Sequence, residues 1–281
     1  QKSFPMILPL NWEQFLCVSS SLSKELTVVT GPPGTGKSQV LLAATAAALL
    51  QGQRVLIATT NNQALDLLFE KMTKGTPLAL PIRLGRKDLW EETAQKIQDW
   101  RDLSKERSAA PIEIPYDRVE KAQRALFSCT DHKERKESLQ KIAPACVSWG
   151  RYLWERLWRK TKISSALDEA LCTRSSLSSS LETCGTLLFG STLSSVPNLP
   201  LIQGLFDLLI IDEASQCDVF SVLPALWRSK RILVIGDEKQ LSPVYGIEKD
   251  LDDQLGEKIP PSLRFTRSSF FSRCAHLSKP I

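Results

Sequence analysis

The sequence is poor in the features that build metal sites, membrane spans and export signals. Its 281 residues include only two histidines, His132 and His276, and neither has a second ligand at metal-binding spacing. The longest apolar-rich stretch, residues 40–50, is about half of the ~20 residues that a membrane-spanning helix needs. The first residues lack the basic start and small-residue cleavage site of a signal peptide. We therefore expect no zinc site, no membrane anchor and no export.

Paired cysteines are also missing. The seven cysteines lie at positions 17, 129, 146, 172, 184, 217 and 274, and none belongs to a CxxC pair. An odd, dispersed set is typical of reduced thiols inside a cell rather than of a disulfide framework. This favours an intracellular protein, either cytoplasmic or nuclear.

The overall composition is ordinary, but the charge is unevenly distributed. With 42% hydrophobic and 24% charged residues, the chain resembles a globular protein large enough to bury a core. The net charge is +5, and residues 83–162 hold 19 Lys and Arg against 13 Asp and Glu. The basic excess therefore lies in the middle of the chain. A solvated helical face explains most of it, and nucleic-acid binding is the alternative for part of it.

Short apolar runs alternate with helix-forming stretches on both sides of that middle segment. Strands are expected at residues 25–30, 54–59, 185–191, 206–213 and 231–237, and helices at about 39–52, 63–72 and 219–228. Strands of continuous apolar character are typical of parallel pairing, in which both faces are buried. The pattern predicts an α/β fold with an open parallel sheet and helices on both faces.

The middle of the chain follows a different pattern. Between residues 75 and 180, apolar residues recur every three or four positions, as in YDRVEKAQRALF and WGRYLWERLW. We assign residues 1–80 and 184–281 to one discontinuous domain, and residues 81–183 to a mainly helical insertion. The Ser-rich stretch SSLSSSLETC (175–184) returns the chain to the sheet as either a flexible linker or a helix end.

The stretch GPPGTGKS fits the phosphate-loop pattern G-x4-G-K-[S/T] and lies between a predicted strand and a predicted helix. Its glycines permit the backbone angles that turn successive N–H groups toward one anion. Lys37 can reach the terminal phosphates of ATP, and the Ser38 hydroxyl can ligate Mg²⁺. The predicted nucleotide-binding loop comprises Gly31, Pro32, Pro33, Gly34, Thr35, Gly36, Lys37 and Ser38.

Two other predicted strands end in residues that can do chemistry. The run LLIIDE ends in Asp212, which is suited to hold Mg²⁺, and Glu213, which is suited to orient and deprotonate a water. The run RILVI leads into GDEKQ, where the amide of Gln240 can sense a γ-phosphate or its attacking water. Taken alone, GDEKQ reads as an ordinary turn shaped by Asp237. Because parallel strands end at one edge of the sheet, we expect one catalytic site formed by Lys37, Asp212, Glu213 and Gln240.

These stretches together resemble a known family. GPPGTGKS, TTNNQALD, LLIIDEASQ and GDEKQLSPV, in this order, resemble motifs I, Ia, II and III of superfamily 1 helicases. The nearest branch is 1B, which includes the nonsense-mediated-decay helicase and senataxin-like enzymes, and NWEQFLCV resembles its Q motif. The resemblance implies a P-loop NTPase of the RecA-like type and covers residues 1–80 and 184–281. The insertion matches the stalk and 1B subdomain of that branch by position only.

The resemblance also implies roles for individual residues. Gln14 would read the adenine edge, and Gln240 would couple the nucleotide state to a neighbouring domain. Contacts with single-stranded DNA or RNA are implied for Thr60, Asn61, Asn62, Ser191 and Thr192. For these residues, helix caps and turns are the alternative roles. Tryptophans of the insertion could stack on bases, although burial between helices is favoured for them.

The resemblance implies the motor domain of an ATP-driven helicase or translocase. Such helicases also need a second RecA-like domain with a QYRM-like motif and an arginine finger, and the printed sequence stops before such a motif. An arginine finger typically contributes ~10³–10⁵ in rate. We therefore expect these residues alone to bind nucleotide, hydrolyse it weakly and unwind nothing.

Two other functions are alternatives to a helicase motor. The first is a non-catalytic, nucleotide-dependent switch that binds nucleic acid. It would explain the absence of a second domain, but Lys37, Ser38 and Glu213 are all intact. The second is a P-loop kinase or transferase, and nothing in the sequence resembles the acceptor-binding lid that such an enzyme needs.

Overall fold

A computed structural model describes residues 3–32, 34–73, 81–84, 116–160, 188–199, 201–237, 239–240, 243, 251, 254, 256–257 and 269–281. Six strands of this part form one sheet in the order β1-β6-β5-β2-β4-β3, and every neighbouring pair is parallel. The strands are β1 (Leu26–Thr30), β2 (Val55–Thr59), β3 (Pro81–Arg83), β4 (Leu188–Thr192), β5 (Leu208–Ile211) and β6 (Ile232–Gly236). The predicted parallel α/β sheet is confirmed, and all five predicted strands are present.

The sixth strand, β3, was not predicted. It is three residues long, pairs with β4, and lies within the segment that we assigned to the insertion. The sheet therefore extends beyond residue 80, and residue 81 does not begin the insertion. A short edge strand of Pro, Ile and Arg carries no continuous apolar run, so its sequence gives no strand signal.

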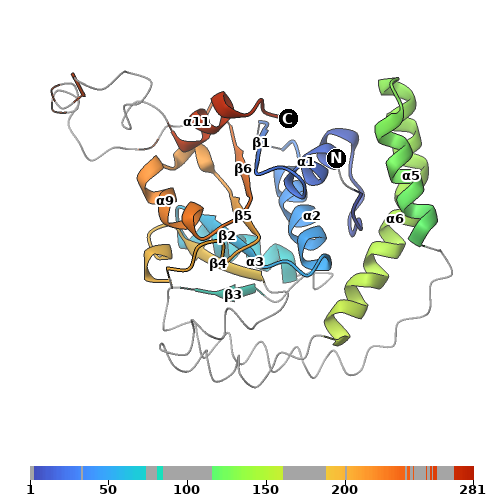
Figure 1. Cartoon of the computed structure of the whole chain (residues 1–281), viewed down its shortest axis with the longest axis horizontal. Coiled ribbons are helices and arrows are strands. Elements are labelled where there is room, and N and C mark those ends of the chain that lie inside the picture. Colours follow the sequence, from blue (N-terminus) through green and yellow to red (C-terminus); the bar gives the residue numbers. More distant parts are fainter. Residues whose placement is uncertain are drawn as a thin grey trace.

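The strands bury side chains on both faces of the sheet. In β2, Val55 and Ile57 belong to one hydrophobic cluster, whereas Leu56 and Ala58 belong to a second. The first cluster includes residues of α1 (Trp12–Ser21), α2 (Lys37–Leu50) and α3 (Asn62–Thr73), and the second includes residues of α9 (Val219–Trp227) and α11 (Phe270–Leu277). Figure 1 shows α1 and α2 to the right of the sheet, with α9 and α11 to its left. The expected cover of helices on both faces is confirmed.

Local sequence explains where two of these helices begin. Asn11 and Gln14 form a capping box at the start of α1, in which each side chain accepts a hydrogen bond from the other's backbone N–H. Gly36 precedes α2 in a left-handed conformation with φ of 86°, which glycine adopts without steric cost. The body of α2 is rich in small and aliphatic residues that favour helix and fit against the sheet.

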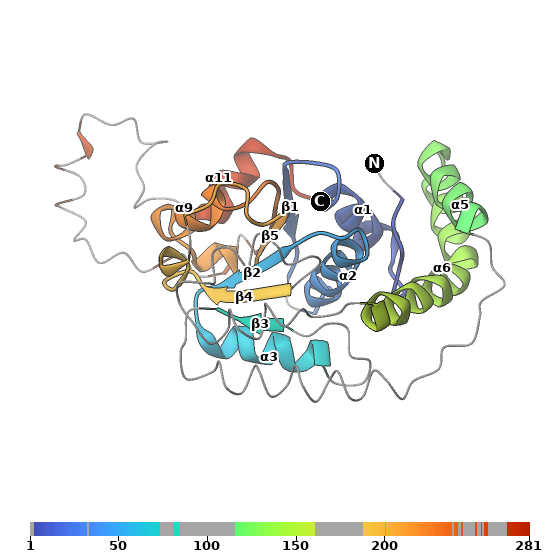
Figure 2. The same ribbon diagram turned by 60° about the horizontal axis from the view of Figure 1, so that its bottom comes forward.

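The described part of the insertion is helical, as expected. It consists of α5 (Tyr116–Ser128) and α6 (His132–Lys160), which lie on the outer side of α1 and α2 in both views (Figures 1 and 2). Phe127 of α5 contacts the rings of Trp12 and Phe15 of α1, and the Arg135 guanidinium lies 4.8 Å from the Trp12 ring centroid. Packing onto α1 thus anchors the insertion to the sheet domain.

Only some of the expectations about the insertion concern residues that the structure describes. Trp149 is buried, as favoured above. The side chains of the other tryptophans at positions 90, 100, 154 and 158, and the Ser-rich stretch 175–184, lie outside the described residues. Within the described ranges, we find no helix with the length and apolar character of a membrane span.

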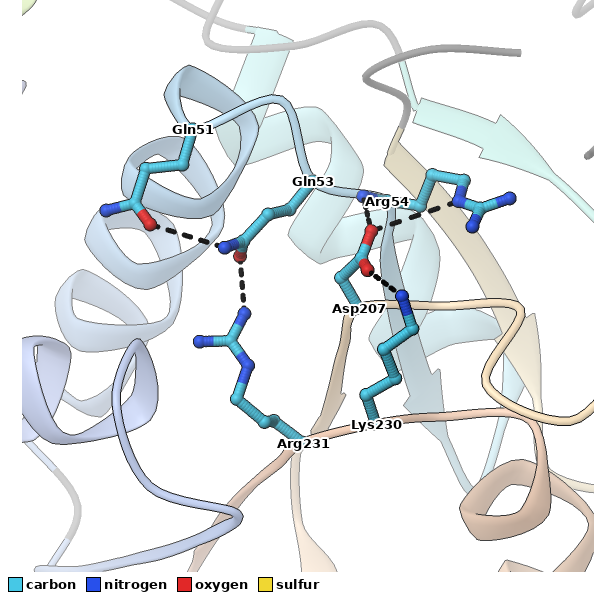
Figure 3. A network of polar contacts seen from close by, with 6 residues as sticks. All are labelled: Gln51, Gln53, Arg54, Asp207, Lys230 and Arg231. Atoms are coloured by element: carbon cyan, nitrogen blue, oxygen red, sulfur yellow. Dashed lines mark hydrogen bonds and ion pairs between the residues drawn. The ribbon is translucent and has the colours of Figure 1, made fainter. Parts of the chain in front are cut away.

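A polar network crosses the edge where the strands begin (Figure 3). The carboxylate of Asp207, just before β5, accepts hydrogen bonds from the Arg54 backbone N–H at 2.9 Å and from Lys230 Nζ at 2.8 Å. Burial tends to raise the pKa of Asp207, but these hydrogen bonds and the nearby Lys230 and Arg54 charges outweigh it and lower the pKa. Asp207 therefore joins the chain segments that lead into β2, β5 and β6.

Arg231 forms the second half of the same network. Its guanidinium donates to the backbone carbonyl of Leu22, at the end of α1, and to the side chain of Gln53 at 2.6 Å. Gln53 in turn donates to Gln51 at 3.2 Å. This arginine ties the end of α1 and the turn after α2 to the start of β6.

Candidate active site

A cavity of about 380 Å³ opens at the opposite edge, where the strands end. Its lining residues are Gly34, Gly36, Lys37, Ser38, Asp212, Glu213, Gly236 and Gln240. They lie at or after the ends of β1, β5 and β6, which are neighbours in the sheet. The fold thus brings together the loop, the acidic pair and the amide that we expected to form one site.

The loop before α2 is shaped to surround an anion. Gly34 and Gly36 have φ of 84° and 86°, in the left-handed region that favours glycine. The Thr35 hydroxyl donates to the Pro32 carbonyl at 2.8 Å, and Lys37 Nζ donates to the Gly31 carbonyl. The helix N-terminus of α2 adds its partial positive charge to the cavity. Pro33 lies outside the described residues.

Asp212 and Glu213 follow β5 directly. Glu213 has φ of 54°, which makes it the single non-glycine residue with positive φ within the described ranges. Its backbone N–H donates to Asp212 Oδ1 at 3.0 Å. Burial raises the pKa of Glu213, the Asp212 charge adds to that effect, and Lys37 opposes it. A carboxylate with a raised pKa, carried on a left-handed backbone and facing a phosphate loop, is suited to accept a proton from water.

The turn after β6 is held by Ser215, which sequence reasoning missed. The Ser215 hydroxyl donates to the Asp237 carbonyl and accepts from the Asp237 N–H, both at 2.8 Å. A Cβ atom on Gly236 would lie 2.7 Å from this hydroxyl, so only glycine permits the approach. Ser215 therefore ties the acidic segment of the site to the Gln240 segment.

Asp237 shapes the turn itself. Its carboxylate accepts from the Lys239 N–H at 2.9 Å, and its carbonyl accepts from the Gln240 N–H at 3.1 Å. These bonds are typical of an Asx-type turn. Gly236 and Gln240, at the two ends of this turn, both line the cavity.

Gln14 approaches the loop from α1. Its side chain is buried, and Nε2 donates to Gln39 Oε1 at 3.3 Å. A Cβ atom on Gly36 would lie 2.4 Å from Gln14 Nε2, which shows how closely the amide approaches the loop. Gln39, on the first turn of α2, is a second residue that sequence reasoning missed.

The residues expected to contact nucleic acid lie on the other half of the same edge. Thr60, Asn61 and Asn62 follow β2, and Ser191 and Thr192 end β4, the neighbour of β2. The Asn61 side chain accepts from the Ala64 N–H at 2.8 Å and so caps α3, and the Asn62 side chain accepts from Arg83 at 2.5 Å. The alternative role of a helix cap is therefore observed for Asn61, whereas Asn62 joins the start of α3 to Arg83 of β3.

The hydroxyls of the same group differ in their surroundings. Ser191 is fully buried and donates to the Thr192 carbonyl at 3.1 Å, while the Thr192 hydroxyl donates to Ser195 Oγ at 2.9 Å. The Thr60 hydroxyl is buried without a hydrogen-bond partner in the part of the chain that the structure describes. Contact with nucleic acid stays a prediction for all five residues, and Ser191 would need to become exposed to make one through its side chain.

Comparison with known proteins identifies the family. The family described as an AAA domain matches residues 9–246, which is most of the chain. The chain belongs to this AAA-domain family. The match spans every strand and the whole cavity lining, so the AAA domain here is the parallel sheet with its phosphate loop and its helical insertion.

Curated relatives of this AAA domain include a DNA helicase, a DNA-binding protein and a regulator of nonsense transcripts. DNA polymerase alpha-associated DNA helicase A of Saccharomyces cerevisiae is 27% identical over 251 residues, 86% of this chain and 34% of that protein. DNA-binding protein SMUBP-2 of Mus musculus is 26% identical over 89% of this chain and 24% of that protein. Regulator of nonsense transcripts 1 of Dictyostelium discoideum is 24% identical over 89% of this chain and 16% of that protein.

These matches confirm the predicted resemblance to superfamily 1 helicases of the 1B branch and the P-loop NTPase fold. This AAA domain corresponds to the first RecA-like domain of such helicases. The chain spans about a third or less of the length of the three relatives named above.

Proposed function

We propose that the chain acts as the ATP-hydrolysing motor domain of a superfamily 1 helicase or translocase. The observation that carries the proposal is the cavity that Lys37, Glu213 and Gln240 line together from three neighbouring strand ends. A phosphate loop alone fits any phosphate-binding protein. An acidic pair and an amide sensor at the same cavity favour hydrolysis coupled to movement.

In the proposed reaction, the loop N–H groups and Lys37 hold the phosphates of ATP. Glu213 accepts the proton of the attacking water, and its raised pKa suits a base that works near neutral pH. Gln240 senses the γ-phosphate and transmits its loss through the turn that Ser215 fixes. Hydrolysis would thus change the position of the segment after β6.

The donor atoms of the cavity fit a magnesium ion. Ser38 contributes a hydroxyl and Asp212 a carboxylate, which are the oxygen ligands that Mg²⁺ prefers. When bound with ATP, Mg²⁺ would neutralise charge that develops on the phosphates. We propose that Ser38 and Asp212 hold it there.

We propose that single-stranded DNA or RNA binds along the other half of the edge, over β2 and β4. Adjacent strand ends there carry Thr60, Asn61 and Thr192, while the nucleotide cavity occupies β1, β6 and β5. Both halves belong to one continuous sheet. A shift driven at the nucleotide cavity would therefore reach the nucleic-acid half through the sheet.

We further propose that a second RecA-like domain completes the motor by supplying arginines to the phosphates. An intracellular location also fits, because the described cysteines at 17, 129, 146, 217 and 274 are free thiols. Activity of the 281 residues alone should be limited to nucleotide binding and slow hydrolysis. Fast hydrolysis by this piece alone, stimulated by a nucleic-acid strand, would contradict the need for the second domain.

The proposal is tested by ATP binding to the purified chain with and without Mg²⁺. Lys37→Ala should weaken ATP binding by at least about tenfold, because it removes charge-assisted hydrogen bonds to phosphate. The matched control is Gln203→Ala, an exposed position away from the cavity lining. Equal ATP affinity of the Lys37→Ala protein and the wild type would contradict the proposal.

A further inference from the structure

The side chain of Gln39 joins three segments next to the phosphate loop. Its Nε2 donates to the Pro9 carbonyl, in the segment before α1, and its Oε1 accepts from Gln14 Nε2 at 3.3 Å. An amide with a carbonyl on one side and an N–H donor on the other can adopt only one of its two flipped orientations. Gln39 therefore presents its oxygen, and not its nitrogen, to Gln14.

The same reasoning fixes Gln14. Its Oε1 accepts from the Asn11 backbone N–H at 3.0 Å, and its Nε2 donates to Gln39. Flipping the Gln14 amide would place its N–H groups against the Asn11 backbone N–H and its oxygen against Gln39 Oε1. A carboxamide has two lone pairs and two N–H groups, so one acceptor and one donor remain available in a fixed order.

This fixed pair lies beside the nucleotide cavity. A Cβ atom added to Gly36, which lines the cavity, would lie 2.4 Å from Gln14 Nε2 and 3.5 Å from Gln39 Oε1. Adenine presents an acceptor at N7 and a donor at its 6-amino group, whereas guanine presents acceptors at both N7 and O6. The remaining donor and acceptor of Gln14 match N7 and the 6-amino group of adenine. With guanine, the Gln14 oxygen would face O6, so that two acceptors would oppose each other.

We propose that Gln39 is a positioning residue for base recognition, which makes the cavity selective for adenine over guanine nucleotides by fixing the orientation of the Gln14 amide. The inference rests on the proposed function, because it requires that a nucleoside triphosphate occupy the cavity. Gln39 acts through Gln14 and does not itself contact the phosphates. The phosphate loop alone would give triphosphate affinity without base preference.

The test measures binding of ATP, GTP and inorganic tripolyphosphate to the wild type and to Gln39→Leu. The wild type should prefer ATP to GTP. Gln39→Leu should weaken ATP binding by about 5- to 20-fold, the usual effect of losing a positioned hydrogen bond, and leave GTP and tripolyphosphate within about twofold. The ATP-to-GTP preference is the readout, because a merely structural role would change all three affinities together.

Two further variants keep the test decisive. Gln39→Glu retains the acceptor that faces Gln14 and should therefore retain most of the preference for ATP over GTP, even where its negative charge weakens the binding of all three ligands. Gln203→Leu is the matched control and should behave as the wild type does. If Gln39→Leu does not fold, a Gln39→Glu protein whose ATP preference is lost still overturns the inference.

The possible results separate this inference from the function on which it rests. Equal weakening of ATP, GTP and tripolyphosphate by Gln39→Leu would show a structural tie only and overturn the inference. A wild type that binds ATP and GTP equally would also overturn it, while leaving the proposed function intact. A wild type that binds none of the three ligands would overturn the proposed function itself.

Discussion

The two edges of the sheet shift the pKa values of their carboxylates in opposite directions. At the edge where strands begin, Asp207 has a backbone donor and a lysine within 2.9 Å, and its pKa is lowered (Figure 3). At the edge where strands end, Glu213 has a strained backbone, faces a cavity, and has a raised pKa. A lowered carboxylate pKa marks a group whose charge is satisfied within the fold. A raised one marks a group suited to chemistry with a ligand.

The largest expected difference is in catalysis. Glu213→Gln removes the proposed base but keeps the shape of the side chain, so ATP turnover should fall by at least about 100-fold while ATP affinity stays within a few-fold. Turnover is measured on the purified chain with Mg²⁺, and affinity by titration with a fluorescent ATP analogue. Unchanged turnover would remove Glu213 as the base and favour the non-catalytic switch.

The reverse result is expected at the other edge. Asp207→Ala leaves the Arg54 N–H and the Lys230 ammonium without their acceptor, so the free energy of unfolding should fall by about 2 kcal/mol. ATP affinity should stay within about twofold. Chemical denaturation gives the stability, and Asp207→Asn is the matched control that keeps an acceptor and should lose less. A weaker ATP affinity with unchanged stability would contradict the structural role of this edge.

Ser215 tests whether the two active segments act together. Ser215→Ala leaves the Asp237 N–H without its acceptor and leaves the Asp237 carbonyl with the Gln240 N–H alone, so the free energy of unfolding should fall by about 1 kcal/mol. Turnover should fall several-fold more than ATP affinity does, because the Gln240 turn loses its fixed position. Ser229→Ala, which removes a hydroxyl bonded within α9 and its following turn, is the control. An equal loss of turnover in Ser215→Ala and Ser229→Ala would argue against coupling between the acidic segment and the Gln240 segment.

The contrast between the edges also explains what sequence could predict. The phosphate loop and the acidic pair are contiguous stretches with fixed spacing, and the long apolar strands are continuous runs, so local pattern was sufficient for all of them. The bonds from Gln14 to Gln39 and from Ser215 to Asp237 join residues 25 and 22 positions apart, and the bond from Arg54 to Asp207 spans 153 positions. Strand order decides which of these distant residues meet. Local sequence does not encode that order, and for the same reason the burial of Ser191 was missed. The strand β3 was missed because its three residues contain no continuous apolar run.

The smallest expected effect is the pH dependence of stability, and its sign differs between the edges. The pKa of Asp207 is lowered on folding, so its ionised form stabilises the fold above the ordinary carboxylate pKa of about 3.9. That contribution is lost as the pH falls through the folded-state value, and the stability difference between wild type and Asp207→Asn should therefore shrink in acid.

Glu213 should show the opposite dependence. Because its pKa is raised on folding, its ionised form destabilises the fold at neutral pH, and protonation relieves this as the pH falls through the raised value. Glu213→Gln should therefore be slightly more stable than the wild type at pH 7, with the difference vanishing toward the unfolded pKa of about 4.3. Denaturation at several pH values measures both differences. Acid should lower the stability of the wild type relative to Asp207→Asn and raise it relative to Glu213→Gln. If both relative stabilities change in the same direction, the distinction between a satisfied edge and a reactive edge fails.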